Sequence, residues 1–570
     1  MSSVSISQKL PPGLAAFCSR WGKELGVVLA LLVTLAAPWV LKPKESTAGS
    51  HYDRRLVIIT PHNQKIRQEF STAFARYWRE KTGEKLNIDW RVQGTSEISI
   101  YLRSEYSAAF EQFWTQKLGK AWTREIAMAF ANGKLAMPVA GEKPTAAQEA
   151  RKMFLESNTG VGIDLFFGGG SYDFQKQSSA GFLVSAAHDG KNGVGELFAK
   201  HGPWFTDAVI PSSVSGEDFY DKEKRWVGSC LSSMGIVFNR DALKRLGVTS
   251  EPTQWKDLAN PLLAGQVALS DPNKSGTVTK ALEQIIQQQM QMAIDEVKKN
   301  PKQFQTAKEQ VAEGLNIGWE RGLQLILRIC ANARYFTDAA TKIPLEVSQG
   351  DAAAGMCIDY YGRSFEEQVR KPDGTTRVGY VTPVGGSSVG VDPVGMLRGA
   401  PEPELATAFM EFVLSDEGQK IWNYRPGSPG GPENAALRRL PVRRDFYTEA
   451  NRQYMADAAL RPFDEAKAFT YHPEWTMPLF DVIRFLVRVM CIDLHEEQRE
   501  SWRILAQANF PPRATAMFED VKLVNYQSAL NLAAELKRND KEQEVKKSRE
   551  LSSVFRGQYD KSRELARRGQ

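Results

Sequence analysis

The chain has 570 residues, of which 42% are apolar, so it is long enough to bury several hydrophobic cores and to form two or more globular units. Its net charge of +6 is small for this length, and the C-terminal segment 537–570 carries most of the excess, with 11 Lys or Arg against 6 Asp or Glu. A nucleic-acid-binding body needs a basic face over a folded domain, so this charge distribution argues against nucleic acid as a partner.

The cysteines do not form a recognisable pattern. Their number is odd and no pair has CxxC spacing, so neither a zinc site nor a disulfide framework is indicated. Most are expected to be small buried apolar residues. They are Cys18, Cys230, Cys330, Cys357 and Cys491.

The N-terminal region predicts a membrane segment. Leu25–Leu41 contains 17 residues without a charge, and lysines or arginines flank it on both sides. As a helix it would span about 25 Å, against about 30 Å for a hydrocarbon core. Pro38 and Trp39 spoil the expected cleavage site, which favours an uncleaved signal-anchor over a removed signal peptide. We therefore expect a cytoplasmic leader (1–24), a membrane helix (25–41), a linker (42–54) and an extracytoplasmic body, anchored to the inner membrane on its periplasmic side or secreted after cleavage.

The body begins with a strand, a helix and a second strand. Leu56–Thr60 is a continuous apolar run, and apolar residues at helical spacing follow it before the next strand, Leu86–Val92. This order predicts parallel pairing. Thr60 and His62 follow the first strand, and His62 is either a ligand contact or the cap of the helix. The segment 104–131 then adds a helix or helical pair whose wide apolar stripe packs on the body or docks a partner.

Three later stretches place small or polar residues where a strand ends or where the chain crosses from one lobe to the other. After the strand Gly162–Phe167 come Gly168, Gly169, Gly170 and Ser171, whose amides could form an anion-binding nest. The run Trp226–Arg240 predicts a crossing between two lobes, with Ser229 and Ser232 at the crossing, and Val378–Val391 predicts a second one.

A helix start follows the strand Val267–Leu269. Ser275, Gly276 and Thr277 lie where the helix begins, which allows ordinary capping, anion binding, or both.

The stretch Gly350–Arg363 predicts a glycine turn and a short buried strand that ends at Asp359, Tyr360 and Tyr361. In an open α/β sheet, ligands bind beyond the carboxyl ends of the strands, so these side chains are candidate ligand contacts. The alternative is half-buried packing with solvated hydroxyl groups.

Several of these stretches together resemble the extracellular solute-binding proteins of bacterial ABC importers, in particular the ferric-iron and sugar-phosphate or phosphonate group. The resemblance covers about Leu56–Trp422 and is carried by FVLSDEGQKIWN, LSDPNKSGTVTKALEQI, IDLFFGGG, LSSMGIVFNRDALKRLG and GDAAAGMCIDYYG. It implies an α/β fold of the type 2 periplasmic-binding-protein kind, with two lobes joined by hinge strands, helical insertions and a helical C-terminal extension. We expect lobe 1 at 55–230 and 390–510, lobe 2 at 231–389, and a charged helical tail at 511–570.

The resemblance also indicates which classes of ligand to expect. In ferric-binding members an adjacent tyrosine pair holds the metal, and Tyr360 and Tyr361 match that pair. Their acidic ligand falls where this sequence has Gly168–Gly170, and His62 is offset from their histidine. We therefore expect no cofactor and a small anionic solute, such as a sugar phosphate or phosphonate, with ferric iron as the alternative.

The expected partners are an ABC permease and ATPase, together with the membrane through the N-terminal helix. A membrane-tethered sensor or scaffold with the same fold is the other alternative. No enzyme is predicted, since GxxxxGK[ST] and HExxH are absent and the match to GxSxG at 386–390 lacks a following helix.

Overall fold

The computed structural model describes residue 31 and residues 52–139, 141–300, 306–536 and 541–570. The chain divides into two compact units, Met1–Asp53 and Arg54–Gln570, and the second is described below. Of the expected membrane helix Leu25–Leu41, only Leu31 is described, so that prediction falls outside the described residues. Within the described part, no helix is both long enough and apolar enough to cross a membrane.

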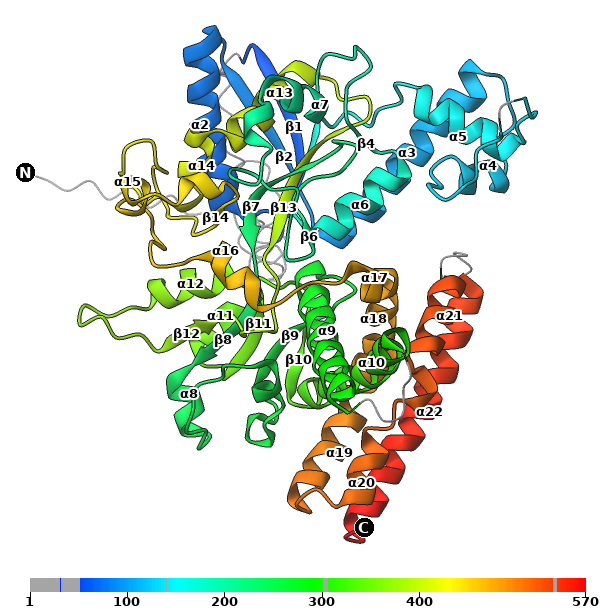
Figure 1. Cartoon of the computed structure of the whole chain (residues 1–570), viewed down its shortest axis with the longest axis vertical. Coiled ribbons are helices and arrows are strands. Elements are labelled where there is room, and N and C mark those ends of the chain that lie inside the picture. Colours follow the sequence, from blue (N-terminus) through cyan, green and yellow to red (C-terminus); the bar gives the residue numbers. More distant parts are fainter. Residues whose placement is uncertain (1–30, 32–51, 140, 301–305, 537–540) are drawn as a thin grey trace, which may run out of the picture. The chain divides into compact units, whose positions relative to one another are not determined.

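The first lobe is built on a mixed seven-stranded sheet, in the upper half of Figure 1. As predicted, β1 runs parallel to β2, with Ile58 opposite Trp90, and β1 is also parallel to β3. β13 runs antiparallel to both β3 and β7. The strands are β1 (Arg54–Thr60), β2 (Leu86–Val92), β3 (Leu165–Phe167), β4 (Leu183–Val184), β7 (Val227–Ser232), β13 (Gly390–Leu397) and β14 (Leu440–Pro441).

The second lobe has a five-stranded sheet in the order β10-β9-β11-β8-β12. β9 is parallel to β10 and β11, whereas β8 is antiparallel to β11 and β12. The strands are β8 (Met234–Asn239), β9 (Val267–Ser270), β10 (Ala333–Thr337), β11 (Ala354–Ile358) and β12 (Val378–Val381). A separate two-stranded hairpin consists of β5 (Ser213–Val214) and β6 (Glu217–Asp218).

Two crossings connect the sheets, as the sequence predicts. Only Ser233 separates β7 in the first sheet from β8 in the second, and the chain returns from β12 to β13 through residues 382–389. The unit is therefore a two-lobed α/β body whose lobes are linked through strands.

Helices cover the sheets because their apolar faces match the sheet surfaces. In the first lobe, Phe70 and Phe74 of α2 meet Phe409 of α13 and Trp422 of α14, and each such buried side chain contributes about 1.5–3 kcal/mol. Residues 403–423 form two helices, because Ser415 ends one and caps the next. First-lobe helices are α2 (Gln64–Thr82), α3 (Thr95–Gln112), α4 (Arg124–Ala129), α5 (Ala146–Glu156), α6 (Ser171–Ala180), α7 (Val194–Lys200), α13 (Pro403–Leu414) and α14 (Asp416–Asn423); second-lobe helices are α8 (Arg240–Arg245), α9 (Gly276–Lys299), α10 (Ala307–Ala331), α11 (Lys342–Gln349) and α12 (Asp359–Gln368).

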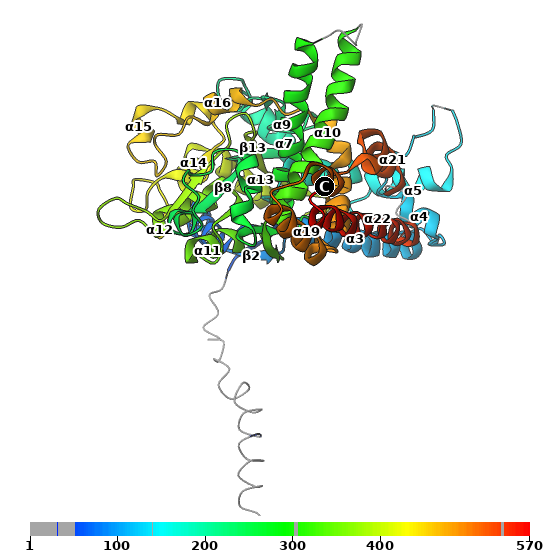
Figure 2. The ribbon, with the colours of Figure 1, turned by 90° about the horizontal axis from the view of Figure 1, so that it is seen from below.

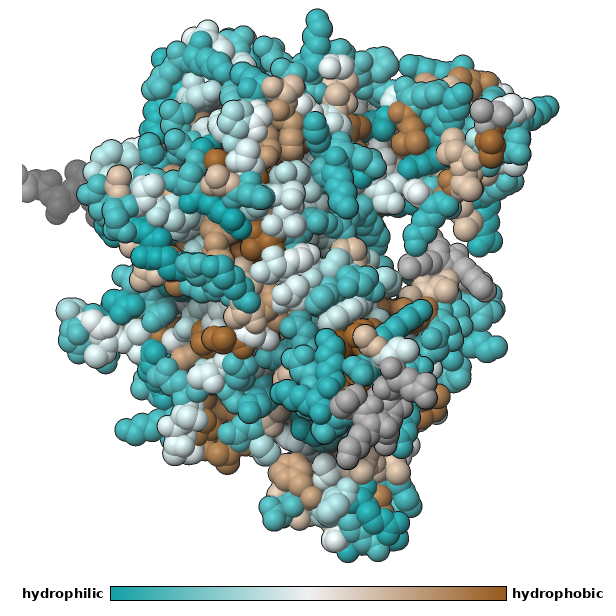
Figure 3. All heavy atoms as spheres, in the orientation of Figure 1, coloured by the Kyte–Doolittle hydropathy of each residue, from teal (hydrophilic) through white to brown (hydrophobic). Residues whose placement is uncertain are grey.

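The helical segment 104–131 packs on the body through its aromatic stripe. The ring of Phe110 stacks on Phe130, at 5.2 Å between centroids, and lies edge-on to Phe154 of α5 at 5.2 Å. A π-helical turn, Phe113–Lys117, continues α3 and turns Trp114 inward. Figure 3 nevertheless shows apolar surface on this addition, at the upper right, on a face that is otherwise largely polar.

Residues 473–570, here called the C-terminal addition, pack on the second lobe, whereas we had expected 390–510 to belong to lobe 1. Helix α18 contacts α9, and α19 contacts α10 (Figure 1). Trp319 Nε1 of α10 donates to Val524 O at 2.8 Å, and Arg328 pairs with Glu519. Its helices are α17 (Pro473–Thr476), α18 (Phe480–Val487), α19 (His495–Gln507), α20 (Pro512–Phe518), α21 (Tyr526–Leu536) and α22 (Lys541–Arg567), and the short helices α15 (Glu449–Arg452) and α16 (Pro462–Glu465) precede it.

The expected charged tail at 511–570 also differs from the structure. Helix α22 buries Leu551, Phe555 and Tyr559 against α19 and α20, and Tyr559 donates a hydrogen bond to Met490 O at 2.7 Å. Its charged residues occupy the solvent face of an amphipathic helix, which accounts for its polar composition. Figure 2 shows that the far ends of α9 and α10 project beyond the rest of the unit.

Candidate functional site

Most of the polar residues selected from the sequence lie in two groups along the boundary between the lobes. The hinge cluster surrounds β13, and the helix-start cluster surrounds the first turns of α6 and α9. The hinge cluster comprises His62, Tyr360, Tyr361, Asp392 and Arg439; the helix-start cluster comprises Thr95, Ser99, Gly170, Ser171, Asp173, Ser275, Gly276, Thr277 and Arg484.

His62 is a buried member of the hinge cluster and not a helix cap. The neighbouring Asn63 caps α2 by accepting a hydrogen bond from Ile66 N at 3.1 Å. The imidazole of His62 packs edge-on against Phe167, and its Nε2 lies 3.6 Å from Asp392 Oδ2. Neither ring nitrogen has a hydrogen-bond partner among the described residues. Burial lowers the pKa of His62, although Asp392 acts in the opposite direction.

Asp392 and Arg439 form a buried ion pair beside His62. Nη2 of Arg439 contacts Asp392 Oδ2, and its Nε donates to the Cys230 sulfur at 3.2 Å. Burial by itself would raise the pKa of Asp392, but Arg439 and His62 hold it below its ordinary value. The same carboxylate raises the pKa of Arg439 against the effect of burial, so the pair stays ionised.

The two tyrosines approach this pair from α12 of the second lobe. The Arg439 guanidinium lies 4.4 Å from the centre of the Tyr360 ring, and the Tyr360 and Tyr361 rings are 4.1 Å apart. Asn63 of the first lobe lies close enough to Tyr361 to affect its pKa, so this contact crosses the boundary. Burial raises the pKa of both phenols, so both are protonated at neutral pH and can donate hydrogen bonds.

Asp359 directly follows the end of β11 and makes contacts within its own helix. It starts α12, accepts a hydrogen bond from its neighbour Tyr360 N at 2.8 Å, and pairs with Arg363 at 3.0 Å. These contacts occupy both carboxylate oxygens and fix the first turn of the helix. The side chain therefore positions the tyrosines.

Of three predicted hydroxyl residues, Thr60 and Ser229 form hydrogen bonds with the backbone. Thr60 Oγ1 donates to Phe167 O at 2.6 Å and accepts from His62 N, while Ser229 Oγ donates to Asp392 O at 2.7 Å. Ser232 is the last residue of β7, pairs with Gly390 and is 8% exposed. Thr60 and Ser229 thus hold the loops that carry the hinge cluster.

The glycine run after β3 lets the first lobe approach the site closely. Gly168 has a φ of +87°, and a Cβ atom there would collide with the imidazole of His62. Gly169, with a φ of +110°, lies against Thr95. Gly170 and Ser171 then start α6, whose first amides have no partner inside the helix.

The start of α9 meets the start of α6 across the boundary. Ser275 caps α9, and its Oγ accepts from Val278 N at 3.3 Å. A Cβ atom placed on Gly276 would lie 3.6 Å from Asp173 Oδ2 and 3.9 Å from both Arg484 Nη2 and the Thr95 Cβ. Two helix starts, one cation and one carboxylate thus converge on Gly276 and Thr277.

An ion pair also joins the lobes. Lys280 Nζ of α9 lies 2.9 Å from Glu217 Oε1 of β6 and 3.0 Å from Glu283 Oε2. Ser388, in the second crossing, donates to Glu217 as well. The lobes are therefore in direct contact at this end of the boundary.

No group of three or more His, Cys, Asp or Glu among the described residues could hold a metal ion. A metal at the hinge cluster would therefore depend on the phenols of Tyr360 and Tyr361, which would have to lose protons that burial retains.

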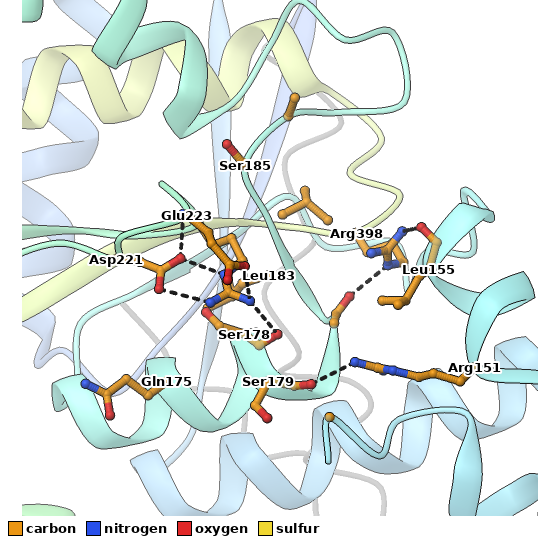
Figure 4. Close-up of a pocket in the computed structure, with 15 residues that line it drawn as sticks. Arg151, Leu155, Gln175, Ser178, Ser179, Leu183, Ser185, Asp221, Glu223 and Arg398 are labelled. Atoms are coloured by element: carbon orange, nitrogen blue, oxygen red, sulfur yellow. Dashed lines mark hydrogen bonds and ion pairs between the residues drawn. The ribbon is translucent and has the colours of Figure 1, made fainter. Parts of the chain in front are cut away.

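A separate pocket of about 740 Å³ lies within the first lobe, at the far end of α6 from the helix-start cluster (Figure 4). Three of its lining arginines are already engaged. Arg151 donates to Ser179 O and Ala180 O, Arg398 donates to Gly181 O and Leu155 O, and Arg225 pairs with Asp221. Because these guanidinium groups satisfy carbonyls at helix ends, the pocket is a structural junction between α5 and α6.

Sequence reasoning missed four charged residues of the two clusters. Asp173 stands three residues into α6, where acidic residues are common for helical reasons alone. Asp392 lies within a strand, and Arg439 and Arg484 lie in stretches with no motif. Their nearness to the site follows from tertiary structure.

Residues 205–447 match the family model for bacterial extracellular solute-binding proteins. The resemblance expected from the sequence is confirmed. The matched segment contains both crossings, the second lobe, α13, α14 and the hinge cluster except for His62.

An uncharacterised protein of Haemophilus influenzae is 23% identical over 34% of this chain and 45% of its own length. The phosphoglycerate transport regulatory protein PgtC of Salmonella typhimurium is 24% identical over 34% of this chain and 40% of its own length. The chain thus spans less than half the length of these relatives.

Among solved structures, the periplasmic binding protein AfuA from Actinobacillus pleuropneumoniae, with fructose-6-phosphate bound, aligns with a TM-score of 0.46 at 15% identity. The alignment covers 79% of this chain and 97% of AfuA. Iron-bound HitA from Pseudomonas aeruginosa aligns with a TM-score of 0.41 at 15% identity, over 75% and 98% of the two chains.

Proposed function

We propose that this protein captures a small anionic solute, a sugar phosphate or phosphonate, between its two lobes and presents it to an ABC-type importer. The convergence of two helix starts, one from each lobe, on Gly276 carries the proposal. Free first-turn amides and the positive end of the helix dipole favour an anion, and here two such ends face the same space. Closing the lobes around the anion would complete its contacts.

The hinge cluster supports a neutral or anionic ligand rather than a trivalent metal. Tyr360 and Tyr361 are protonated, and ionising a phenol at pH 7 costs about 4 kcal/mol before burial adds to it. Arg439 already brings a positive charge to the Tyr360 ring. Protonated tyrosines suit the hydroxyl and phosphate oxygens of an organic phosphate.

The name of the Salmonella relative contributes a second line of support. That protein is described as acting in phosphoglycerate transport, and a phosphoglycerate is an organic phosphate of the size that two contacting lobes can enclose. The proposed partners are a membrane permease and its ATPase on the extracytoplasmic side of the membrane. The proposed role is that of a carrier without catalysis.

Isothermal titration calorimetry on the full chain tests the proposal, with 3-phosphoglycerate, fructose 6-phosphate and ferric citrate as probes. We expect one organic phosphate to bind with a stoichiometry of one and to raise the melting temperature. The same protein should stay colourless with ferric citrate. A stoichiometric visible band that is lost in both Tyr360→Phe and Tyr361→Phe would show a tyrosinate–iron centre and contradict the proposal.

A regulatory role is the second candidate, because the Salmonella relative is described as a transport regulatory protein. A sensor of the same fold would bind the same solute but act on a signalling partner, such as a histidine kinase. Deleting the gene separates the two roles. A carrier is required for uptake even when the transporter is expressed constitutively, whereas a sensor is required only for induction.

A further inference from the structure

The C-terminal addition supplies a buried arginine to the boundary between the lobes. Arg484 belongs to α18, which lies beyond residues 205–447 that match the family model, and only 10% of its side chain is exposed. The same helix region contacts α6 of the first lobe. Tyr172 OH donates to Asp481 Oδ2 at 3.3 Å, and the Tyr172 ring lies 4.3 Å from that of Phe480.

Neighbouring residues fix the orientation of the Arg484 guanidinium. Its Nε donates to Thr279 Oγ1 at 3.1 Å, its Nη1 donates to Asp481 Oδ1 at 3.2 Å, and the group lies 4.8 Å from the centre of the Phe480 ring. Its Nη2 is buried without a partner among the described residues and faces the start of α9, 3.9 Å from a Cβ placed on Gly276. Two nitrogens anchor the group and the third is left to bind something else.

Asp173 faces the same space from the first lobe. It is 3% exposed, and its Oδ1 accepts a hydrogen bond from Ser99 Oγ at 3.4 Å. Its Oδ2 lies 3.6 Å from a Cβ placed on Gly276, yet no ion pair joins Asp173 to Arg484 within the described structure. Burial raises the pKa of Asp173, and the charges of Arg484 and Lys176 act in the opposite direction. A hydrogen-bond donor without a partner and a carboxylate acceptor therefore both lie next to Gly276 in the described structure.

We infer that Arg484 and the first amides of α9 bind the phosphate or phosphonate group of the ligand, while Asp173 accepts a hydrogen bond from a hydroxyl next to it. This inference rests on the proposed function and deepens it. It assigns a binding residue to the C-terminal addition, and it narrows the ligand to organic phosphates or phosphonates that carry a neighbouring hydroxyl group. It also gives the C-terminal addition a role in ligand recognition, because the Arg484 guanidinium of α18 lies next to both the first lobe and the second lobe.

Titration calorimetry with 3-phosphoglycerate tests the role of Arg484. A charge-assisted contact between guanidinium and phosphate is lost in Arg484→Gln, so the dissociation constant should rise at least about tenfold. Arg488→Gln is the matched control. Arg488 is the next arginine along the chain, and it pairs with Glu544 at a distance of 3.6 Å, in a place that is not at the lobe boundary. Its substitution should leave the affinity within about twofold of the wild type.

The role of Asp173 is tested with 3-phosphonooxypropanoate, the analogue of 3-phosphoglycerate that lacks the hydroxyl. Wild-type protein should bind the analogue about tenfold or more weakly than 3-phosphoglycerate, and Asp173→Asn should discriminate less between the two. Equal discrimination by both proteins would overturn the assignment of Asp173.

A measurement on the unaltered chain covers the case in which a variant fails to fold. Modification by phenylglyoxal, mapped by mass spectrometry, should be slowed at Arg484 by 3-phosphoglycerate and unchanged at Arg488. Two results would overturn the inference and leave the proposed function standing. In the first, Arg484→Gln binds 3-phosphoglycerate as tightly as the wild type does. In the second, the wild type binds 3-phosphoglycerate but Arg484 is modified by phenylglyoxal as fast as without it. Absence of binding of every organic phosphate to the wild type would instead overturn the proposed function, and this inference with it.

Discussion

His62 lies against the hinge with both ring nitrogens buried and without hydrogen-bond partners among the described residues. A charged imidazole there would lose its hydration, and the carboxylate of Asp392, at 3.6 Å, is already paired with Arg439. The neutral form is therefore favoured in the folded state. The unfolded chain has no such restriction and takes up a proton at the ordinary pKa of about 6.5.

This difference predicts a pH dependence of stability. Because the folded pKa of His62 is lowered, the unfolded state binds more protons once the pH falls below about 6.5, so stability is lost on acidification. Relative to His62→Gln, the wild type should lose up to about 1.4 kcal/mol per pH unit in that range. Urea denaturation at pH 7.5 and pH 5.5 measures the effect.

The exposed His188 provides the control, since His188→Gln should show the same difference from the wild type at both pH values. A wild type that gains stability relative to His62→Gln on acidification would show instead that Asp392 holds the imidazole in its charged form.

At this scale the sequence predicts some members of the site and misses others. His62, the glycine run, Ser275 and the tyrosine pair all stand next to the end of a strand or the start of a helix, so local pattern was enough to select them. Arg439 and Arg484 are far along the chain from the strand ends they approach. No periodicity or turn residue marks them, because only the packing of β14 and α18 brings them to the boundary.

The first turn of helix α9 combines a helix cap with a glycine at the proposed binding site. Ser275 caps it, and Gly276 follows with no side chain to fill the space between Asp173 and Arg484. An alanine methyl group at that position would make ordinary van der Waals contacts, at 3.6 to 3.9 Å, rather than collisions. The glycine is therefore not required by the fold of the described structure.

Gly276→Ala should consequently separate binding from stability. Replacing a helical glycine by alanine should leave the ligand-free protein as stable as the wild type or up to about 1 kcal/mol more stable. The added methyl group should occupy the space proposed for the phosphate and weaken binding of 3-phosphoglycerate at least about tenfold. Thermal melts with and without ligand measure both effects.

Gly557→Ala is the matched control for this substitution. Gly557 lies within α22 with nothing within 4 Å of an added Cβ, so it should give the helix-propensity gain without changing affinity. If Gly276→Ala bound 3-phosphoglycerate as well as the wild type, the ligand would lie elsewhere along the boundary.

Helices and strands were predicted correctly where the spacing of apolar residues and the order of the strands along the chain indicated the same structure. The parallel pair β1 and β2, the two crossings and the aromatic stripe of 104–131 follow from runs of apolar residues. Asp359–Tyr361 follow the end of the buried strand β11 as predicted, and they also form the first turn of α12, which the sequence pattern did not indicate. Segment 511–570 has a charged composition because one face of α22 carries charged side chains. Phe555 and Tyr559, on the other face of this helix, are buried.

At the scale of the whole unit, the two lobes touch each other at both ends of their boundary. Lys280 and Glu217 join them at one end, and the contact between Tyr361 and Asn63 joins them at the other. Both contacts use polar groups that water can satisfy equally well when the lobes separate. The strands that cross between the lobes, in contrast, cannot be broken without disrupting both sheets.

We therefore expect the lobes to move about the crossings and the ligand to favour the closed arrangement. Small-angle X-ray scattering should give a smaller radius of gyration with saturating 3-phosphoglycerate than without it. Lys280→Met should enlarge the ligand-free particle further, because it removes the ion pair to Glu217. A ligand that binds with measurable heat but without any compaction would indicate a rigid scaffold instead.

The interleaved strand order has a consequence for how the chain reaches its folded state. β13 lies between β3 and β7 in the first sheet, yet it follows them in the sequence only after the entire second lobe. In a chain that emerges from its N-terminus, the first sheet lacks its central strand until residue 397 is available, and Val394 must find Phe167 across more than 200 residues of separation. Such long-range closure makes folding slow and leaves the edges of β3 and β7 unpaired meanwhile. The second lobe, continuous from β8 to β12, can close first and serve as the template on which the first is completed.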